Sequence, residues 1–228
     1  MVAKTENEEG LEAAMENYLL AHIDPEPPLL HRLWRATQLH STYPHMVCGH
    51  LQGRVLRMLV AMIKPRRVLE IGTFSGYATL CMAEALPPGA EIHTVEINDE
   101  QEPFTRPWLE QSPRAADIHL HIGDAMDVVP RLPAPFDLVY LDADKRRYAD
   151  HYRLCLPLIP PGGYLLADNT LWDSHPADPK RQDPQTQGIR AFNDLVAQDD
   201  RVEKVILPLR DGLTIIRKKQ WIAPDNRK

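Results

Sequence analysis

Acidic and amide side chains follow two short apolar runs in the second half of the chain. Asp142 comes directly after the run 138–141, and Asp168 and Asn169 come directly after the run 165–167. Such runs are typical of buried parallel strands, whose carboxyl ends meet at one edge of a sheet. Three hard oxygen ligands, with room left for water or substrate, would form a magnesium-type site there. Any one of these residues could instead cap a helix, but the three together favour the metal.

Lys145 is the candidate general base beside this acidic cluster. It lies three residues after Asp142, about one turn into a helix that would begin here, so its ammonium group can lean back toward the metal. Burial and a nearby cation disfavour the charged form of a lysine, and a neutral amine can accept the proton of an acceptor hydroxyl. The alternative is a solvated lysine in the first turn of a helix.

A glycine-containing turn follows the first predicted strand. Residues 70–77 read Glu-Ile-Gly-Thr-Phe-Ser-Gly-Tyr, and the glycines permit a tight turn and close approach of a ligand to the backbone. The turn has neither the GxGxxG pattern nor the Gly-Lys-Ser/Thr end of a phosphate-binding loop, so a pyrophosphate is not its expected ligand. Glu96 ends the second strand, where a carboxylate can accept two hydrogen bonds from a ribose diol, and residues 123–126 suit an adenine. Together these loops predict a nucleoside site, whereas the turn alone could be an ordinary strand-to-helix connection.

The hydrophobic pattern around these residues predicts a doubly wound α/β sheet. Apolar residues at helical spacing predict helices over 9–21, 29–40 and 49–63. Short apolar runs, separated by enough chain for crossovers, predict parallel strands over 67–72, 91–96, 118–122, 136–141 and 164–167. The tail predicts strands over 202–207 and 213–217, joined by a turn with an Asp-Gly hairpin signal, so that one strand is antiparallel.

We therefore expect the Rossmann-like α/β fold with a mostly parallel seven-stranded sheet. The length fits a single domain, 1–228, with a helical N-terminal cap over 1–63 and a core over 64–218.

Composition narrows the classes of function. The formal net charge of -6 argues against a nucleic-acid partner, because the basic runs are short and have acidic residues nearby. The three cysteines are widely spaced with no CxxC pair, so neither a disulfide framework nor a structural zinc site is expected. There is no basic, apolar leader and no run of about 18 apolar residues, so we expect a cytoplasmic protein with no membrane partner.

Over residues 46–218 the chain resembles the cation-dependent O-methyltransferases typified by the caffeoyl-CoA and catechol enzymes and their bacterial relatives. The motifs that carry the resemblance are Met46-x-x-Gly49-x-x-x-Gly53, residues 70–77, Val95-Glu96-Ile97-Asn98, residues 141–145 and residues 168–172. Ala78 departs from the family, which commonly has a serine or threonine hydroxyl there, near the cofactor's carboxylate.

The resemblance implies S-adenosylmethionine as cofactor and a divalent cation, most simply Mg²⁺, with Mn²⁺ or Ca²⁺ as alternatives. The implied cofactor site is lined by Met46, Cys48, Gly72, Phe74, Glu96, Ala125 and Ala143, and we assign Glu70, Ser75 and Asp142 to the same site. The implied metal ligands are Asp142, Asp168 and Asn169, with Lys145 as the base, Asp142 as its catalytic partner and Trp172 at the border of the substrate.

The expected reaction is methyl transfer to a hydroxyl of a small catechol-like or hydroxycinnamoyl-type aromatic. Two alternatives stay open: a methyltransferase acting on another small molecule or a nucleoside, and a non-catalytic module that binds a nucleoside or dinucleotide. Because the family often pairs through its N-terminal helices, we also expect a homodimer.

Overall fold

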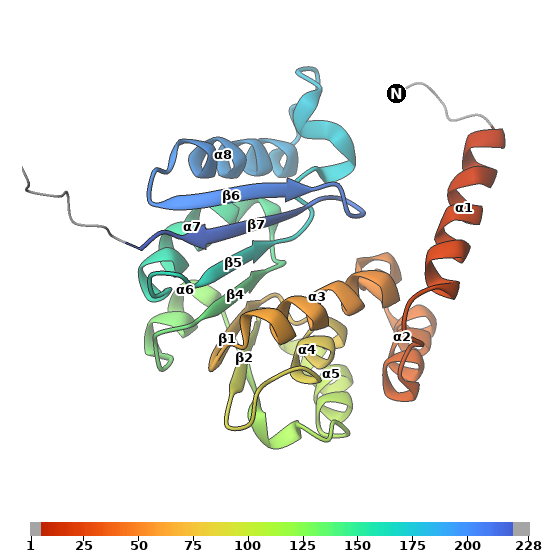
Figure 1. Cartoon of the computed structure of the whole chain (residues 1–228), viewed down its shortest axis with the longest axis horizontal. Helices are drawn as coiled ribbons and strands as arrows, with labels where there is room; N and C mark the ends of the chain where they lie inside the picture. Colours follow the sequence, from red (N-terminus) through yellow and green to blue (C-terminus); the bar gives the residue numbers. More distant parts are fainter. Residues whose placement is uncertain (1–5, 221–228) are drawn as a thin grey trace, which may run out of the picture.

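A seven-stranded sheet forms the centre of the protein (Figure 1). The computed structural model describes the backbone of residues 6–220 and the side chains of residues 14–220. The strands are β1 (Arg67–Ile71), β2 (Glu91–Glu96), β3 (Ile118–Ile122), β4 (Leu138–Leu141), β5 (Tyr164–Ala167), β6 (Val202–Leu207) and β7 (Leu213–Lys218). Their order is β3-β2-β1-β4-β5-β7-β6, and β7 runs antiparallel to both of its neighbours. The predicted doubly wound sheet with one antiparallel strand is confirmed, with that strand lying between β5 and β6.

Helices cover both faces of this sheet (Figure 1). They are α1 (Glu6–Ala21), α2 (Pro28–His40), α3 (Gly49–Ile63), α4 (Tyr77–Ala83), α5 (Glu102–Leu109), α6 (Ala125–Val128), α7 (Tyr148–Cys155) and α8 (Pro184–Gln198). Side chains of α3 and α4 pack on one face, and side chains of α6, α7 and α8 pack on the other. Three short 3-10 helices matter for the site: η1 (Pro44–Met46), η5 (Lys145–Arg147) and η7 (Trp172–Ala177).

The central strand β4 is apolar because both of its faces are buried. Leu138 and Tyr140 join the core on the side of α3 and α4, whereas Val139 and Leu141 join the core on the side of α7 and α8. All four side chains are buried, since a parallel strand between two helical layers has no face in contact with water. The first polar residue after this run, Asp142, therefore comes where the strand leaves the core.

Helix α3 is part of the hydrophobic core of the protein and is not only a cap over the sheet. The stretch Pro44–Ile63, which ends with this helix, is long and apolar enough by composition to cross a membrane. Leu56 and Val60 are nevertheless fully buried against α4 and the sheet, as in the core helix of a globular protein. The single domain and its division at residue 63 stay predictions.

Candidate active site

The carboxyl ends of the parallel strands place the predicted site residues in one row. In the register, Ile71 of β1 lies beside Leu141 of β4, and Leu141 lies beside Ala167 of β5. The ladder continues one residue further, because the amide of Asp142 donates to the Ile71 carbonyl at 2.9 Å and the amide of Asp168 donates to the Leu141 carbonyl at 3.0 Å. Asp142 and Asp168 are therefore neighbours on the edge of the sheet.

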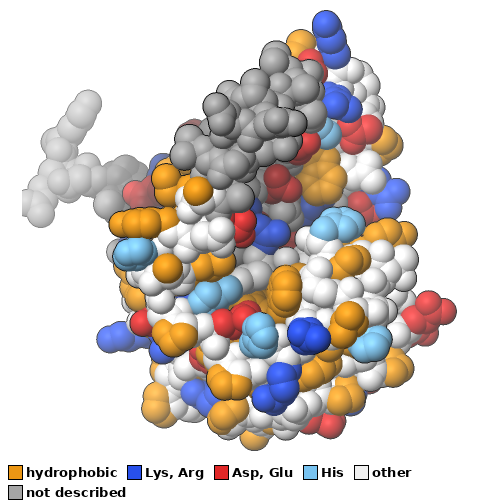
Figure 2. Space-filling view, turned by 90° about the vertical axis from the view of Figure 1, so that its right-hand side faces the viewer, with side chains coloured by type: hydrophobic (Ala, Val, Ile, Leu, Met, Phe, Trp, Pro, Cys, Tyr) orange, Lys and Arg blue, Asp and Glu red, His pale blue; other side chains and the backbone are white. Residues whose placement is uncertain are grey.

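A cleft of about 1180 Å³ opens at this edge. Figure 2 shows the corresponding face, which is hollowed and has acidic and basic side chains in the hollow. The predicted site residues that line the cleft are Met46, Cys48, Gly72, Phe74, Glu96, Ala125, Asp142, Ala143, Lys145, Asp168, Asn169 and Trp172. The fold thus gathers residues more than a hundred positions apart in the sequence around a single cavity.

The turn after β1 needs glycine at position 72 for steric reasons. Gly72 has a φ of +101°, which side-chain-bearing residues rarely adopt, and a Cβ built there would collide with the backbone carbonyl of Asp142. The turn ends at Gly76, which has a φ of +81° and precedes the first residue of α4. The backbone of the turn consequently lies against the strand end that carries Asp142.

Glu96 is held in position by this turn. Its Oε2 accepts a hydrogen bond from the amide of Phe74 at 2.8 Å, and its Oε1 accepts one from the amide of Asn98 at 2.8 Å. Each carboxylate oxygen has two lone pairs, so both retain acceptor capacity on the side of the cleft. This geometry suits recognition of a ribose diol, which was the predicted role of Glu96.

Glu70 and Ser75 lie behind the turn and do not line the cleft. Both are almost fully buried, and the hydroxyl of Thr79 donates to Glu70 Oε2. Glu70 Oε1 has no hydrogen-bond partner among the described residues, and burial raises the pKa of the Glu70 carboxyl to about 8. These two residues would contribute to a cofactor site only by stabilising the shape of the turn.

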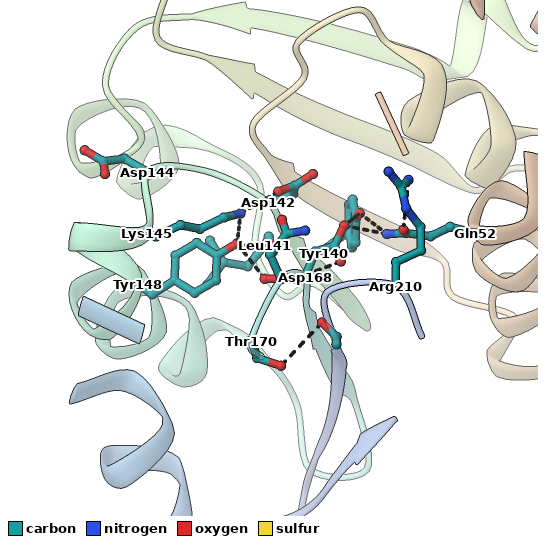
Figure 3. A network of polar contacts seen from close by, with 12 residues as sticks. Gln52, Tyr140, Leu141, Asp142, Asp144, Lys145, Tyr148, Asp168, Thr170 and Arg210 are labelled. Carbon is teal, nitrogen blue, oxygen red and sulfur yellow. Dashed lines mark hydrogen bonds and ion pairs between the residues drawn. The ribbon is translucent and has the colours of Figure 1, made fainter. Parts of the chain in front are cut away.

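The acidic cluster is supported by buried hydrogen-bond donors (Figure 3). Asp168 Oδ2 accepts hydrogen bonds from the Tyr140 hydroxyl at 2.8 Å and from the side-chain amide of Gln52, while Oδ1 accepts one from the Asn169 amide at 2.8 Å. Burial, followed by the negative charge of Asp142, raises the pKa of Asp168 to about 6. Asn169 lines the cleft from a left-handed backbone conformation with a φ of +54°.

Lys145 completes the cluster, but from a different local structure than expected. It is the first residue of η5, capped by the Asp144 side chain, and does not lie one turn into a helix. Its Nζ donates to Asp142 Oδ1 at 2.7 Å and to the Tyr148 hydroxyl at 2.6 Å, and the Trp172 ring centre is 6.0 Å away. The side chain is only 9% exposed, so its charge is paired inside the cleft and is not solvated.

Several residues of this site were not predicted from the sequence. Tyr140 appears as one more apolar strand residue, and Gln52 and Tyr148 appear as ordinary helical positions. Arg210, in the turn between β6 and β7, donates to the backbone carbonyl of Cys48 and thereby ties this turn to the segment before α3. Its contact spans 162 positions of sequence, and no local pattern indicates it.

Comparison with known proteins identifies the family. The sequence profile of the family described as "O-methyltransferase" matches residues 21–219. The chain belongs to this O-methyltransferase family. It is 34% identical over 206 residues to "Caffeoyl-CoA O-methyltransferase 1" of Zea mays, which covers 85% of this chain and 79% of the maize protein. It is also 30% identical over 162 residues to "Catechol O-methyltransferase" of Niastella koreensis, covering 69% of this chain and 73% of that protein.

A solved structure supports the same assignment. The O-methyltransferase TomG from Streptomyces achromogenes, involved in tomaymycin synthesis and crystallised in complex with SAM, superposes on 91% of this chain and 96% of its own. The TM-score is 0.83 at 27% sequence identity. The prediction of an S-adenosylmethionine-dependent O-methyltransferase of the caffeoyl-CoA and catechol type is therefore confirmed at the level of the family.

Replacing Gly72 with alanine tests whether the turn forms the cofactor site of this O-methyltransferase. We expect Gly72→Ala to weaken S-adenosylmethionine binding at least about tenfold, a change of about 1.4 kcal/mol, because the new methyl group collides with the Asp142 carbonyl. Isothermal titration calorimetry measures the affinity. Gly89→Ala is the matched control, since Gly89 also has a positive φ, +76°, but nothing lies within 4 Å of an added Cβ. Equal affinities for the two variants would contradict this role of the turn.

The buried Glu70 should make stability depend on pH. Its pKa of about 8 lies above the ordinary glutamate value of 4.5. Between these values the folded state therefore holds one more proton than the unfolded state, and stability falls as the pH rises through this window. Urea unfolding at pH 5, 7 and 9 should show a smaller loss of stability for Glu70→Gln than for the wild type. Glu203→Gln, at an exposed glutamate of β6, should keep the wild-type loss. An unchanged loss in Glu70→Gln would show that the buried carboxyl is not its source.

Proposed function

We propose that the enzyme transfers the methyl group of S-adenosylmethionine to one hydroxyl of a small aromatic vicinal diol, of the catechol or hydroxycinnamoyl type. The proposal includes a divalent cation, most simply Mg²⁺, held by Asp142, Asp168 and Asn169. The observation that carries it is the position of Lys145, which shares one cleft with these oxygen donors and with the turn at Gly72. A methyl donor, a diol and a base would then meet within that cleft.

The donor set fits a hard cation. Two carboxylates and an amide oxygen are the ligands that Mg²⁺, Mn²⁺ and Ca²⁺ prefer. Asp168 is almost fully buried beside the like charge of Asp142, and burial and this charge raise its pKa to about 6, so a cation would relieve a repulsion that the fold imposes. When bound, a divalent ion would supply Lewis-acid chemistry that lowers the pKa of the acceptor hydroxyl.

Lys145 would act as the general base from its present position. The Tyr148 hydroxyl accepts a hydrogen bond from its Nζ, and that hydroxyl lies 3.0 Å from the Asp168 carbonyl, so Tyr148 fixes the end of the lysine side chain at the cluster. In its neutral form, Nζ would accept the proton of the acceptor hydroxyl, and the ammonium so formed would pair with Asp142. The Trp172 ring, whose centre is 6.0 Å from Nζ, offers an aromatic surface for the ring of the substrate.

The methyl transfer itself needs positioning more than activation. The deprotonated oxygen would attack the methyl carbon in line, and the electron pair of the breaking bond would return to sulfur, leaving a neutral thioether. The positive sulfur already activates the methyl group, so holding the two reactants at contact distance supplies most of the rate enhancement. Glu96 and the turn at Gly72 would hold the donor, while the acidic cluster would hold the acceptor.

The acceptor class rests on the two named relatives, which carry catechol and caffeoyl-CoA in their names. A methyltransferase with another small-molecule or nucleoside acceptor is the second candidate.

We also propose that the protein is a homodimer that pairs through its N-terminal helices, and that it is cytoplasmic. The exposed apolar side chains of Tyr18 in α1 and Leu39 in α2 support the homodimer. Sedimentation equilibrium tests the dimer, and a monomer at micromolar concentration would contradict it.

Labelled methyl transfer to catechol and caffeic acid tests the proposal. Metal-free enzyme should be inactive and should regain activity with Mg²⁺. Lys145→Met should lower kcat at least about a hundredfold, because it removes the base, while the affinity for S-adenosylmethionine stays within about threefold of the wild type. Lys180→Met, at an exposed lysine outside the cleft, should behave as the wild type.

Three results would contradict parts of this proposal. Full activity in the presence of a chelator would exclude the metal. Full activity of Lys145→Met would exclude the base. Intact cofactor binding with no transfer to any aromatic diol would favour the second candidate.

A further inference from the structure

A cluster of histidines lies on the sheet, away from the cleft. Glu91 and His93 lie on one face of β2, and His119 and His121 lie on the neighbouring edge strand β3. In the register, His93 is opposite His119, and successive residues of a strand point to opposite faces, so the four side chains share one face. Glu91 begins β2 and Glu96 ends it, which puts roughly 16 Å of strand between the Glu91 and Glu96 positions.

Three of these side chains point their ligand atoms at one another. His93 Nε2 is 3.5 Å from Glu91 Oε1, and His119 Nε2 is 3.4 Å from Glu91 Oε2. All three ligand atoms lie within 4.8 Å of one another. Ligands of a tetrahedral zinc ion, at bond lengths of about 2.0–2.1 Å, are about 3.3 Å apart, so a small rotation of the rings would close the site.

The ring nitrogen of His93 is the strongest indication that a ligand belongs here. His93 is only 6% exposed, and its Nε2 is buried with no hydrogen-bond partner among the described residues. Buried polar atoms without a partner are rare and call for an explanation. An ion between His93, His119 and Glu91 would supply the missing partner.

His121 plays the supporting part that metal-binding histidines usually require. Its Nε2 lies 3.0 Å from His93 Nδ1, so His93 can donate from Nδ1 and direct the lone pair of Nε2 toward Glu91. The orientation of His93 thus suits a metal ligand.

The neighbouring Arg67 pairs with the Glu91 carboxylate but leaves one of its two oxygens available to an ion. Arg67 Nε donates to Glu91 Oε1 at 2.6 Å, which leaves Oε2, the oxygen that faces His119, as the available ligand. Two imidazoles and one carboxylate suit borderline ions such as Zn²⁺ and Co²⁺ better than the hard cations that prefer oxygen. Three protein ligands leave a fourth position for water or another ligand.

We propose that Glu91, His93 and His119 bind a divalent ion of the zinc class, which fastens the edge strand β3 to β2. This site is independent of the proposed methyl transfer, because it shares no residue with the cleft. A simple hydrogen-bonded cluster of Glu91 with the two histidines is the alternative that the experiment must exclude.

Titration of the metal-free full chain with ZnCl₂ in excess Mg²⁺ tests this site, since Mg²⁺ would occupy the hard oxygen donors of the cleft under the proposed function. Calorimetry should show one Zn²⁺ per chain for the wild type. His119→Gln should bind Zn²⁺ at least about tenfold more weakly and should lose the intense visible absorption that tetrahedral Co²⁺ gives in the wild type. The His119 side chain is 40% exposed, so its replacement should leave the melting temperature in chelator unchanged.

His31→Gln is the matched control, because His31 is also an exposed histidine beside a glutamate, Glu26, at 2.9 Å. This variant should bind Zn²⁺ and Co²⁺ as the wild type does, and both variants should retain methyl transfer with Mg²⁺. No uptake of Zn²⁺ by the wild type, or equal affinity in His119→Gln and His31→Gln, would overturn the proposal and leave the hydrogen-bonded cluster as the explanation.

Discussion

Repulsion between two neighbouring carboxylates is the constraint on which the site of this enzyme depends. The register of β4 and β5 fixes Asp142 and Asp168 side by side, and the second is almost fully buried. Like charges so close in a poorly solvated cleft raise the free energy of the ionised pair, unless a cation or a proton compensates them. In the structure, Lys145 is the cation that contacts Asp142, while burial, followed by the charge of Asp142, raises the pKa of Asp168.

The hydrogen bonds around the pair can be understood as its support. Tyr140 from β4 and Gln52 from α3 donate to one oxygen of Asp168, which orients the carboxylate while its charge is still unmatched. Tyr148 holds Lys145 from the opposite side. The donors come from separate elements, so the site is assembled only when α3, the sheet and η5 have packed together. Buried networks of this kind make the arrangement specific, because each unpaired group would cost free energy.

Much of this arrangement could be predicted from the sequence because it follows local rules. Each strand is an apolar run, each functional residue follows the end of such a run, and parallel strands must bring their carboxyl ends together. That logic predicts Asp142, Asp168 and Glu96 at one edge of the sheet from the sequence alone. It also predicts a tight turn after β1, where Gly72 and Gly76 have the positive φ angles that favour glycine.

The remainder depends on contacts that local patterns do not encode. Glu70 was assigned to the cofactor site because it lies in the turn motif, yet its position in β1 points it into the protein, where Thr79 contacts it. Tyr140 has the same burial as its aliphatic neighbours, so only the packing of α3 shows its polar role. The histidine cluster did leave a signal, since Glu91-x-His93 and His119-x-His121 alternate on adjacent strands, but it becomes informative only once the register is known.

Binding of Mn²⁺, followed by electron paramagnetic resonance of the free ion, tests the central claim about the paired carboxylates most directly. For the cofactor-loaded protein we expect a Mn²⁺ site that Mg²⁺ displaces and that Asp168→Asn weakens at least about tenfold, a change of about 1.4 kcal/mol. Asp194→Asn, at an exposed aspartate of α8, should bind as the wild type. Equal Mn²⁺ affinity in Asp168→Asn and the wild type would contradict a metal site built on this pair.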